Sequence, residues 1–358
     1  MNGKQRVKLA LARREPDRVP VNYMGNPGIT RRLCEHFGID FEAPDRHDRL
    51  MRALGVDFRH AGAHYAGPRL HAEPDDPSLR VSPDWGIQTR YVEHGSGGYW
   101  EPFGSPLKAL DLETARTYPL PSPDDYDYEP VRQACADCTE HAIGTHIGFE
   151  VMNYTARLTG DETMYVGLAM GDPALLTFVE RFTEIKREIL RRTLEAADGK
   201  LDFVGIGEDL GTQRGPRISM DLFRERIRPV HEKSIALIKC YDLPVMIHSC
   251  GSSSWAFEEF IDMGIDAVDT LQPEATDMDP AYLKETYGDR LAFHGCISTA
   301  GPVAYGSVED VVEDVHETLD VMMPGGGYAL APTHQLQDNS PTANVVAMYE
   351  TARSQGWY

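Results

Sequence analysis

Residues 245–297 read VMIHSCGSSSWAFEEFIDMGIDAVDTLQPEATDMDPAYLKETYGDRLAFHGCI, a regular alternation of short apolar runs and helix-like segments. The apolar runs are rich in residues that favour strands, and they comprise Val245–Cys250, Ala267–Gln272 and Leu291–Ile297. Strands that alternate with helices in this way are joined by right-handed crossovers and lie parallel. Both faces of these runs are apolar, which is typical of strands covered on each side.

The same alternation continues in both directions from this stretch. Ser219 and Ser307 are positioned to cap the helices that follow two of the strands, and a final helix is expected near Pro341. The N-terminal half is less regular and contributes three strands to the five in the C-terminal half, a total of eight, which closes a barrel. The predicted strands are 19–23, 56–60, 142–147, 201–207, 245–250, 267–272, 291–297 and 328–332.

We therefore predict one α/β domain over residues 1–358, a (β/α)8 TIM barrel with an N-terminal extension. A long insertion, about residues 63–130, separates strands 2 and 3. Its many prolines and the run Gly95–Gly98 indicate a small β-hairpin and loops near the barrel mouth. A doubly wound open sheet is the competing topology, but no glycine-rich phosphate-binding fingerprint follows Val19–Tyr23.

The charge and composition exclude several classes of partner. With 35 basic and 56 acidic residues, the formal charge of −21 disfavours nucleic acid and anionic membrane surfaces. The chain has no apolar run of about 20 residues that could cross a membrane. Its N-terminus lacks the apolar block of a signal peptide, so a cytoplasmic location is expected. Six cysteines in so long a chain do not form a disulfide scaffold.

Polar and metal-binding side chains gather at the ends of the predicted strands, where parallel barrels carry their functional groups. A purely structural barrel would have mostly valine, leucine and glycine there, so an enzyme acting on a small molecule is favoured over a non-catalytic binding barrel. We expect substrate-binding residues at Asn22, Tyr23, His146, Gln272 and Cys296. The strand ends also present His60, Glu150, Glu208, Asp209, His248, Cys250, His294 and His334.

The most informative local motif is His248-Ser-Cys250, at the end of a predicted strand. Residues two apart on a strand point to the same face, so the imidazole and the thiol converge. This pair suits Zn²⁺, although a buried structural cysteine beside a satisfied histidine is the alternative. His334 is the preferred third ligand and Cys296 its rival. Asp209 or Glu208 could be a fourth ligand or a general base, or the two could form a solvated pair or a helix cap.

Other candidate residues are assigned to structure or to the surface. Cys135 and Cys138 have the spacing of a metal or redox pair, but they lie in a helical pattern without a second such pair. His231 and His316 are expected on the surfaces of helices. No phosphate-binding loop, kinase motif or G-x-S-x-G element is present.

Together these motifs resemble the uroporphyrinogen decarboxylase (URO-D) superfamily. This family includes the decarboxylase of haem synthesis and the cobalamin-dependent methyltransferases that act on thiols such as coenzyme M. The resemblance covers nearly the whole chain and implies a homodimer. The segments that carry it are 16–21, 207–213, 248–251, 260–266, 293–296, 326–334 and 341–345.

Within this family the chain resembles the methyltransferase-like members more than the haem-pathway decarboxylase. That decarboxylase has an arginine-rich segment after its first strand, whereas residues 22–30 here contain no arginine. The thiol-methylating members bind zinc through H-x-C and a distant cysteine. His248 and Cys250 match the first two ligands, and His334 replaces the last cysteine.

The resemblance therefore implies a zinc-dependent methyltransferase that moves a methyl group between a corrinoid protein and a small thiol or methoxy substrate. Asp209 or Glu208 would manage protons. The alternative is a metal-independent decarboxylase or lyase acting on a small carboxylic acid, in which His248, His334 and Asp209 are acid–base groups.

Overall fold

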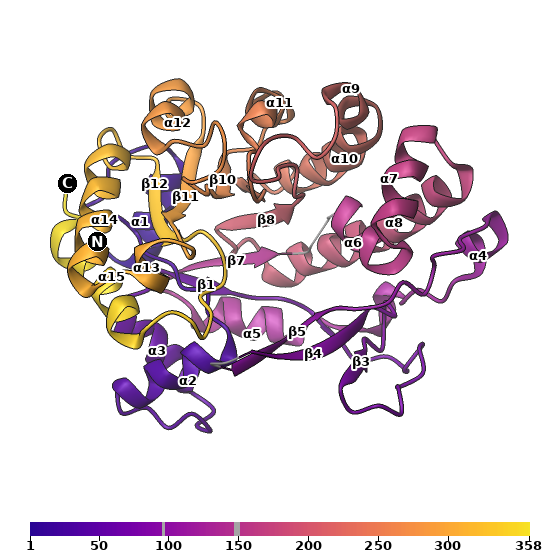
Figure 1. Cartoon of the computed structure of the whole chain (residues 1–358), viewed down its shortest axis with the longest axis horizontal. Helices are drawn as coiled ribbons and strands as arrows, with labels where there is room; N and C mark the ends of the chain where they lie inside the picture. Colours follow the sequence, from indigo (N-terminus) through magenta and orange to yellow (C-terminus); the bar gives the residue numbers. More distant parts are fainter. Residues whose placement is uncertain (95–96, 147–150) are drawn as a thin grey trace.

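The computed structural model describes residues 1–94, 97–146 and 151–358, so Ile147 and Glu150 lie outside the described residues. Its centre is a curled sheet of seven parallel strands in the order β1-β7-β8-β9-β10-β11-β12, with helices outside it (Figure 1). The α/β class and the barrel-like parallel sheet are therefore confirmed. The seven strands are β1 Phe58–His60, β7 Ala142–His146, β8 Phe203–Gly207, β9 Val245–His248, β10 Ala267–Thr270, β11 Ala292–Ile297 and β12 Tyr328–Pro332.

Most helices connect consecutive strands, as the alternation predicts. No helix within the described ranges combines the length and the apolar character needed to cross a membrane. The helices are α1 Gly3–Leu11, α2 Pro27–His36, α3 Arg46–Leu54, α4 Leu112–Thr117, α5 Glu129–Asp137, α6 Val151–Thr159, α7 Asp161–Met170, α8 Pro173–Ala197, α9 Met220–Leu222, α10 Arg228–Lys239, α11 Phe257–Met263, α12 Pro280–Tyr287, α13 Pro302–Tyr305, α14 Val308–Met322 and α15 Thr342–Gln355, with short turns η1 Pro123–Asp125, η2 Phe223–Ile227 and η3 Ser254–Ala256.

The predicted first strand, residues 19–23, is wrong in extent because this segment forms only an isolated bridge from Val21 to Leu330 of β12. Pro20 has no N–H to give to a ladder, which limits pairing on one side. The segment nevertheless runs between the two edges of the seven-stranded sheet. The Asn22 N–H donates to the Leu330 carbonyl at 2.9 Å, and the Asp57 N–H donates to the Val21 carbonyl at 2.9 Å.

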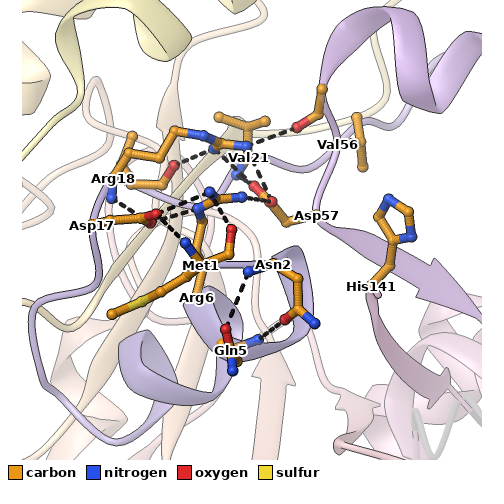
Figure 2. Close-up of polar contacts among 12 residues, drawn as sticks. Met1, Asn2, Gln5, Arg6, Asp17, Arg18, Val21, Val56, Asp57 and His141 are labelled. Atoms are coloured by element: carbon orange, nitrogen blue, oxygen red, sulfur yellow. Dashed lines mark hydrogen bonds and ion pairs between the residues drawn. The ribbon is translucent and has the colours of Figure 1, made fainter. Parts of the chain in front are cut away.

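A buried ion-pair network fixes this segment beside β1 (Figure 2). The Arg18 guanidinium donates to both Asp57 carboxylate oxygens, at 2.9 and 3.1 Å, and Arg6 of α1 donates to Asp57 at 3.2 Å. Asp57 also accepts the Val21 N–H at 3.0 Å. Since Asp57 and Arg18 are almost fully buried, each charge depends on the other for compensation. The network therefore holds the N-terminal segment against the sheet. Asn22 and Tyr23 belong to this segment and reach the site from it.

The segment between β1 and β7 forms a separate layer that packs on α8. It includes a three-stranded antiparallel sheet in the order β3-β4-β5 and a two-stranded pair of β2 with β6. Trp85 and Leu107 of this segment share a small apolar core with Phe178 and Phe182 of α8. The segment is thus attached to the barrel wall. The strands are β2 His64–Tyr65, β3 Leu79–Val81, β4 Gln88–His94, β5 Gly97–Pro102 and β6 Tyr126–Asp127.

The predicted helix cap at Ser307 is confirmed, and we can predict how much its removal should destabilise the protein. The Ser307 hydroxyl accepts the Asp310 N–H at 3.2 Å, and the Asp310 carboxylate accepts the Ser307 N–H at 2.7 Å, forming a capping box at α14. Ser307→Ala should lower the free energy of unfolding by about 1 kcal/mol, measured by urea denaturation. Ser307→Asp, which can still cap, is the matched control. An equal loss in both variants would contradict the capping role.

Candidate active site

Three metal-binding side chains converge where β8 and β9 end. These strands pair in parallel with Gly207 opposite His248, so the residues that follow each strand emerge side by side. The His248 Nε2 lies 3.3 Å from the Cys250 Sγ and 3.8 Å from the Asp209 Oδ1. The donor atoms of all three residues lie within 4.8 Å of one another. The predicted pair His248 and Cys250 is therefore brought together, with Asp209 as the third member of this donor cluster.

Asp269 of β10 orients the His248 ring by contacting its Nδ1, on the side away from the donor cluster. Its Oδ2 accepts from the His248 Nδ1 at 2.6 Å, and its Oδ1 lies 2.5 Å from the Nδ1 of His294. The Thr270 hydroxyl also lies 2.8 Å from the His248 Nδ1. Because the His248 Nδ1 is hydrogen-bonded to Asp269, the Nε2 of the same ring faces Cys250 and Asp209. This is the arrangement of a metal-binding histidine supported by a carboxylate.

Asp269 was not among the residues predicted for the site, although the sequence contains a signal for it. A lone carboxylate stands in the middle of the apolar run Ala267–Gln272, where strand residues are normally apolar. The parallel register places Asp269 opposite both His248 and His294. Asn22 completes the chain of contacts, since its Nδ2 lies 3.0 Å from the Nε2 of His294.

Asp209 is held in place by groups from α6 and from the segments that follow β8 and β9. The Asn153 amide donates to the Asp209 Oδ2 at 2.6 Å, and the Cys250 N–H donates to Oδ1 at 3.0 Å. Arg217 donates to the Asn153 carbonyl oxygen at 2.9 Å and to the Asp209 main-chain carbonyl at 3.2 Å. Neither Asn153 nor Arg217 carries a local motif that sequence reasoning could have used.

Gln272, a predicted substrate-binding residue, contacts the loop that carries Cys250. Its Oε1 accepts the Gly251 N–H at 2.6 Å. Gly251 has φ +73°, and a Cβ there would approach the Gly211 carbonyl to 2.7 Å, so both the backbone conformation and the close approach require glycine. Gln272 thus stabilises the turn that follows Cys250.

The charges in the donor cluster shift the pKa values of its members. Burial opposes charge on His248, yet its hydrogen bonds to Asp269 and Cys250 raise its pKa well above the ordinary value. Burial also raises the pKa of the Cys250 thiol, against the opposing effect of His248. The pKa of Asp269 is lowered: desolvation by burial opposes this, but His294 and His248 outweigh it. Asp209 and Asp269 both lie close to His248, so this part of the site favours a positive charge.

Glu208 lies in the barrel wall and not at the mouth. It is fully buried, and its carboxylate accepts the first N–H groups of α6, from Val151 at 2.7 Å and Met152 at 3.0 Å. The Nε2 of His231 lies 3.0 Å from the same carboxylate. The expectation that His231 is a surface residue is wrong, because it is buried against Glu208. Asp209 is thus the acidic residue of the pair that faces the mouth, and Glu208 occupies a capping position.

Cys296 also lies away from the donor cluster. Gly295 and Cys296 have φ values of +126° and +71°, which interrupt the strand alternation that would have directed this thiol to the mouth. Cys296 is instead buried, and burial together with the nearby Asp314 of α14 raises its pKa. This position does not fit its predicted roles as a substrate-binding residue or a rival ligand.

His334 follows β12 and is exposed at the mouth. It is not a member of the group whose donor atoms lie within 4.8 Å of one another. Desolvation and the neighbouring His248 lower the pKa of His334, with Asp209 acting in the opposite direction, so it lies within electrostatic reach of the donor cluster. A neutral imidazole therefore stands beside the site.

Two cavities with shared lining residues lie on this side of the sheet, and the inner one reaches Asp269. The inner cavity has a volume of about 320 Å³ and is lined by the predicted residues Asn22, Tyr23 and His146 together with Asp269 and His294. An outer cavity of about 880 Å³ lies between the barrel and the segment that follows β1. His60 and His146 line both. Desolvation and the nearby His248 lower the pKa of His146 to about 4, so it is neutral at physiological pH.

Comparison with known proteins identifies the family. The family model described as uroporphyrinogen decarboxylase (URO-D) matches residues 170–355, more than half of the chain, and the chain belongs to this family. The structure of a methyltransferase from Methanosarcina mazei covers 99% of this chain and 99% of its own, with a TM-score of 0.64 and 16% sequence identity. At this identity the likeness shows the fold alone. No curated protein matches the sequence.

Proposed function

We propose that the protein is a zinc-dependent methyltransferase of the corrinoid-linked class. It would move a methyl group between a corrinoid protein and a small thiol or methoxy substrate, and would act as a homodimer. The observation that carries this proposal is the convergence of Asp209, His248 and Cys250 at the carboxyl ends of neighbouring parallel strands. The URO-D family and a methyltransferase with the same fold support it.

The donor cluster fits zinc in chemistry and in spacing. Zn²⁺ in a catalytic site is bound by three protein ligands drawn from thiolate, imidazole and carboxylate, with one position left open. Bonds of about 2.0–2.3 Å in a tetrahedral site place bound atoms roughly 3.3–3.6 Å apart. The separations from the His248 Nε2, 3.3 Å to Cys250 and 3.8 Å to Asp209, are close to these values.

The surrounding residues hold the side chains of this cluster in orientations that suit a bound cation. Asp269 holds the His248 Nδ1, so the Nε2 lone pair is directed at the cluster once its proton is displaced. Asn153 and the Cys250 N–H hold the Asp209 carboxylate in position. When bound, zinc would activate a thiol as a thiolate or polarise the C–O bond of a methoxy group. His334 presents a neutral imidazole at the mouth, which can accept the substrate proton or occupy the fourth position.

A second candidate function is a metal-independent decarboxylase or lyase acting on a small carboxylic acid. The observation that favours it is the His248–Asp269 pair, because the raised pKa of His248 retains a proton that a general acid could donate. In that reaction the Cys250 thiol would have no chemical role.

The test is metal analysis of untagged protein followed by an anaerobic methyl-transfer assay. We expect about one zinc per chain, removable by a chelator, and transfer of methyl from methylcobalamin to 2-mercaptoethanol. The C–Co bond breaks and a C–S bond forms, the thiol proton is released, and cob(I)alamin accumulates with its own absorbance. Protein that contains no metal and gives no cob(I)alamin, but releases CO₂ from a small acid, would support the second candidate instead.

The His334→Ala variant decides whether His334 is a ligand. Because the described geometry places Asp209 and not His334 within the donor cluster, this variant should retain zinc at the wild-type stoichiometry. We expect its methyl transfer to fall, with the KM for the thiol or the pH profile altered, because its imidazole is lost from the mouth. Loss of zinc from His334→Ala would show that the loop closes on the metal and that His334 is a ligand.

A further inference from the structure

The two carboxylate oxygens of Asp209 have different hydrogen-bond partners. The Asn153 amide of α6 donates to Oδ2 at 2.6 Å, and the Cys250 N–H donates to Oδ1 at 3.0 Å. Oδ1 is also the oxygen that lies 3.8 Å from the His248 Nε2. A side chain from outside the donor cluster therefore holds Oδ2, while Oδ1 lies on the side of the cluster.

Arg217 determines which end of the Asn153 amide faces Asp209. The Arg217 Nη1 donates to the Asn153 Oδ1 at 2.9 Å, so the amide nitrogen is left to donate to the Asp209 carboxylate. A reversed amide would place its oxygen against the carboxylate and its N–H groups against the guanidinium. Both contacts would then be repulsive, so the guanidinium fixes one orientation of the amide.

Arg217 is itself anchored on two sides. The loop after β8 folds back on itself, because the Arg217 N–H donates to the Leu210 carbonyl at 2.8 Å and the Arg217 Nη1 donates to the Asp209 main-chain carbonyl at 3.2 Å. On another side, the Arg217 Nε donates to the Tyr165 hydroxyl of α7 at 2.6 Å. Contacts from the loop and from α7 therefore place the guanidinium where it can orient the amide.

The hydrogen bond from Asn153 bears on how Asp209 can bind a metal ion. A carboxylate can bind through one oxygen or through both, and binding through both would fill the position that a catalytic zinc site keeps open for its substrate. To turn Oδ2 toward the metal, Asp209 would have to give up a charge-assisted hydrogen bond and leave the half-buried Asn153 amide unpaired. The contact therefore opposes binding through both oxygens.

We propose that Asn153, oriented by Arg217, restricts Asp209 to metal binding through Oδ1 and so keeps one coordination position of the metal open for the substrate. Asn153 and Arg217 are positioning residues, since neither belongs to the donor cluster. This proposal rests on the proposed function, because it concerns the substrate position of the same metal site.

The test uses the full-length protein with Co²⁺ in place of zinc, because the visible absorption of Co²⁺ reports its coordination. Binding of 2-mercaptoethanol at the open position is followed by the additional thiolate-to-cobalt absorbance. Asn153→Leu removes the amide at similar size and should raise the dissociation constant of the thiol at least about tenfold, the factor that one hydrogen bond to a charged group represents. Its affinity for Co²⁺, measured by competition with a chromophoric chelator, should change far less, because all three donor side chains remain.

Variants of Arg217 provide a second arm that does not alter Asn153. Arg217→Met frees the amide to reverse and should weaken thiol binding, whereas Arg217→Lys keeps a cationic donor and should lie closer to the wild type. Arg214→Met, at an exposed position of the same loop, should leave both affinities unchanged. The unfolding midpoint is measured for each variant, and if Asn153→Leu does not fold, the comparison of Arg217→Met with Arg217→Lys decides.

The results distinguish this proposal from the proposed function. If the wild type binds Co²⁺ and the thiol, and folded Asn153→Leu matches it in spectrum and in both affinities, the role of Asn153 is wrong and the metal site stands. If folded Asn153→Leu loses Co²⁺ itself, Asn153 supports metal binding as a whole and not the open position, which also overturns the proposal. A wild-type protein that takes up neither Co²⁺ nor Zn²⁺ would overturn the proposed function, and this proposal with it.

Discussion

Replacing Cys250 with alanine is expected to abolish stoichiometric zinc binding and, with it, methyl transfer. Cys250 is the donor whose thiolate supplies the softest and most strongly zinc-binding atom of the three, and its Sγ lies 3.3 Å from the His248 Nε2. Loss of a direct ligand should lower zinc affinity by more than the about 10–100-fold typical of an outer-shell partner. Competition with a chromophoric chelator measures this affinity in the isolated protein.

Matched cysteine variants make the result specific. Cys240→Ala removes an exposed thiol at the end of α10 and should leave zinc content and activity unchanged. Cys250→Ser keeps a smaller, weaker donor and should give an affinity between those of the wild type and Cys250→Ala. Full zinc occupancy in Cys250→Ala, with an unchanged dissociation constant, would show that any bound metal lies elsewhere and would remove the basis of the proposed function.

Much of the parallel sheet could be predicted because its strands are short, apolar on both faces and separated by clear helix signals. β12 has the bounds that the pattern predicts, and the cap at Ser307 forms as expected. The first strand was the exception. Pro20 has no N–H to donate, and residues 19–23 form a single bridge to β12. The attachment of this segment depends on the distant pair Arg18 and Asp57. Such a contact between separate segments leaves no periodic signal.

The candidate site was predictable where strand alternation holds and not where it fails. His248 and Cys250 follow the two-residue rule and converge. At the end of β10, Thr270 and Leu271 have φ values of +98° and +37°, and Cys296 after Gly295 is also left-handed. Non-glycine residues in this region cost about 1–3 kcal/mol each and tend to occur at functional sites. They redirect side chains in a way that residue type does not reveal, which is why Cys296 could not be placed from the sequence.

Adjacent acidic residues show a second limit of sequence reasoning. Glu208 and Asp209 cannot both face the mouth from one strand end, but the sequence does not say which one does. The choice depends on α6, whose first N–H groups bind the Glu208 carboxylate, and on His231 from α10. Both partners come from other parts of the chain. Glu208 therefore takes the capping position at α6, and Asp209 joins the donor cluster.

Asp269 should prove the most important residue that does not itself touch the metal. Its carboxylate bridges the Nδ1 atoms of His248 and His294, so it sets the tautomer and the ring orientation of the histidine in the donor cluster. Asp269→Asn keeps the size of the side chain but removes its charge and one acceptor oxygen. We expect zinc affinity to fall by about 10–100-fold, with the fold retained, because outer-shell partners of metal-bound histidines contribute on this scale.

The comparison variants distinguish orientation from general electrostatics. Asp262→Asn removes an exposed carboxylate of α11 and should leave zinc affinity unchanged. Thr270→Val removes the hydroxyl that lies 2.8 Å from the His248 Nδ1 and should cost less than Asp269→Asn, since the carboxylate contact at 2.6 Å remains. Affinity should be measured with the unfolding midpoint of each apo-protein, so that a loss of structure is recognised. If Asp269→Asn binds zinc as tightly as Asp262→Asn does, then His248 is not a ligand held by Asp269, and the acid–base role of this pair becomes the better account of the site.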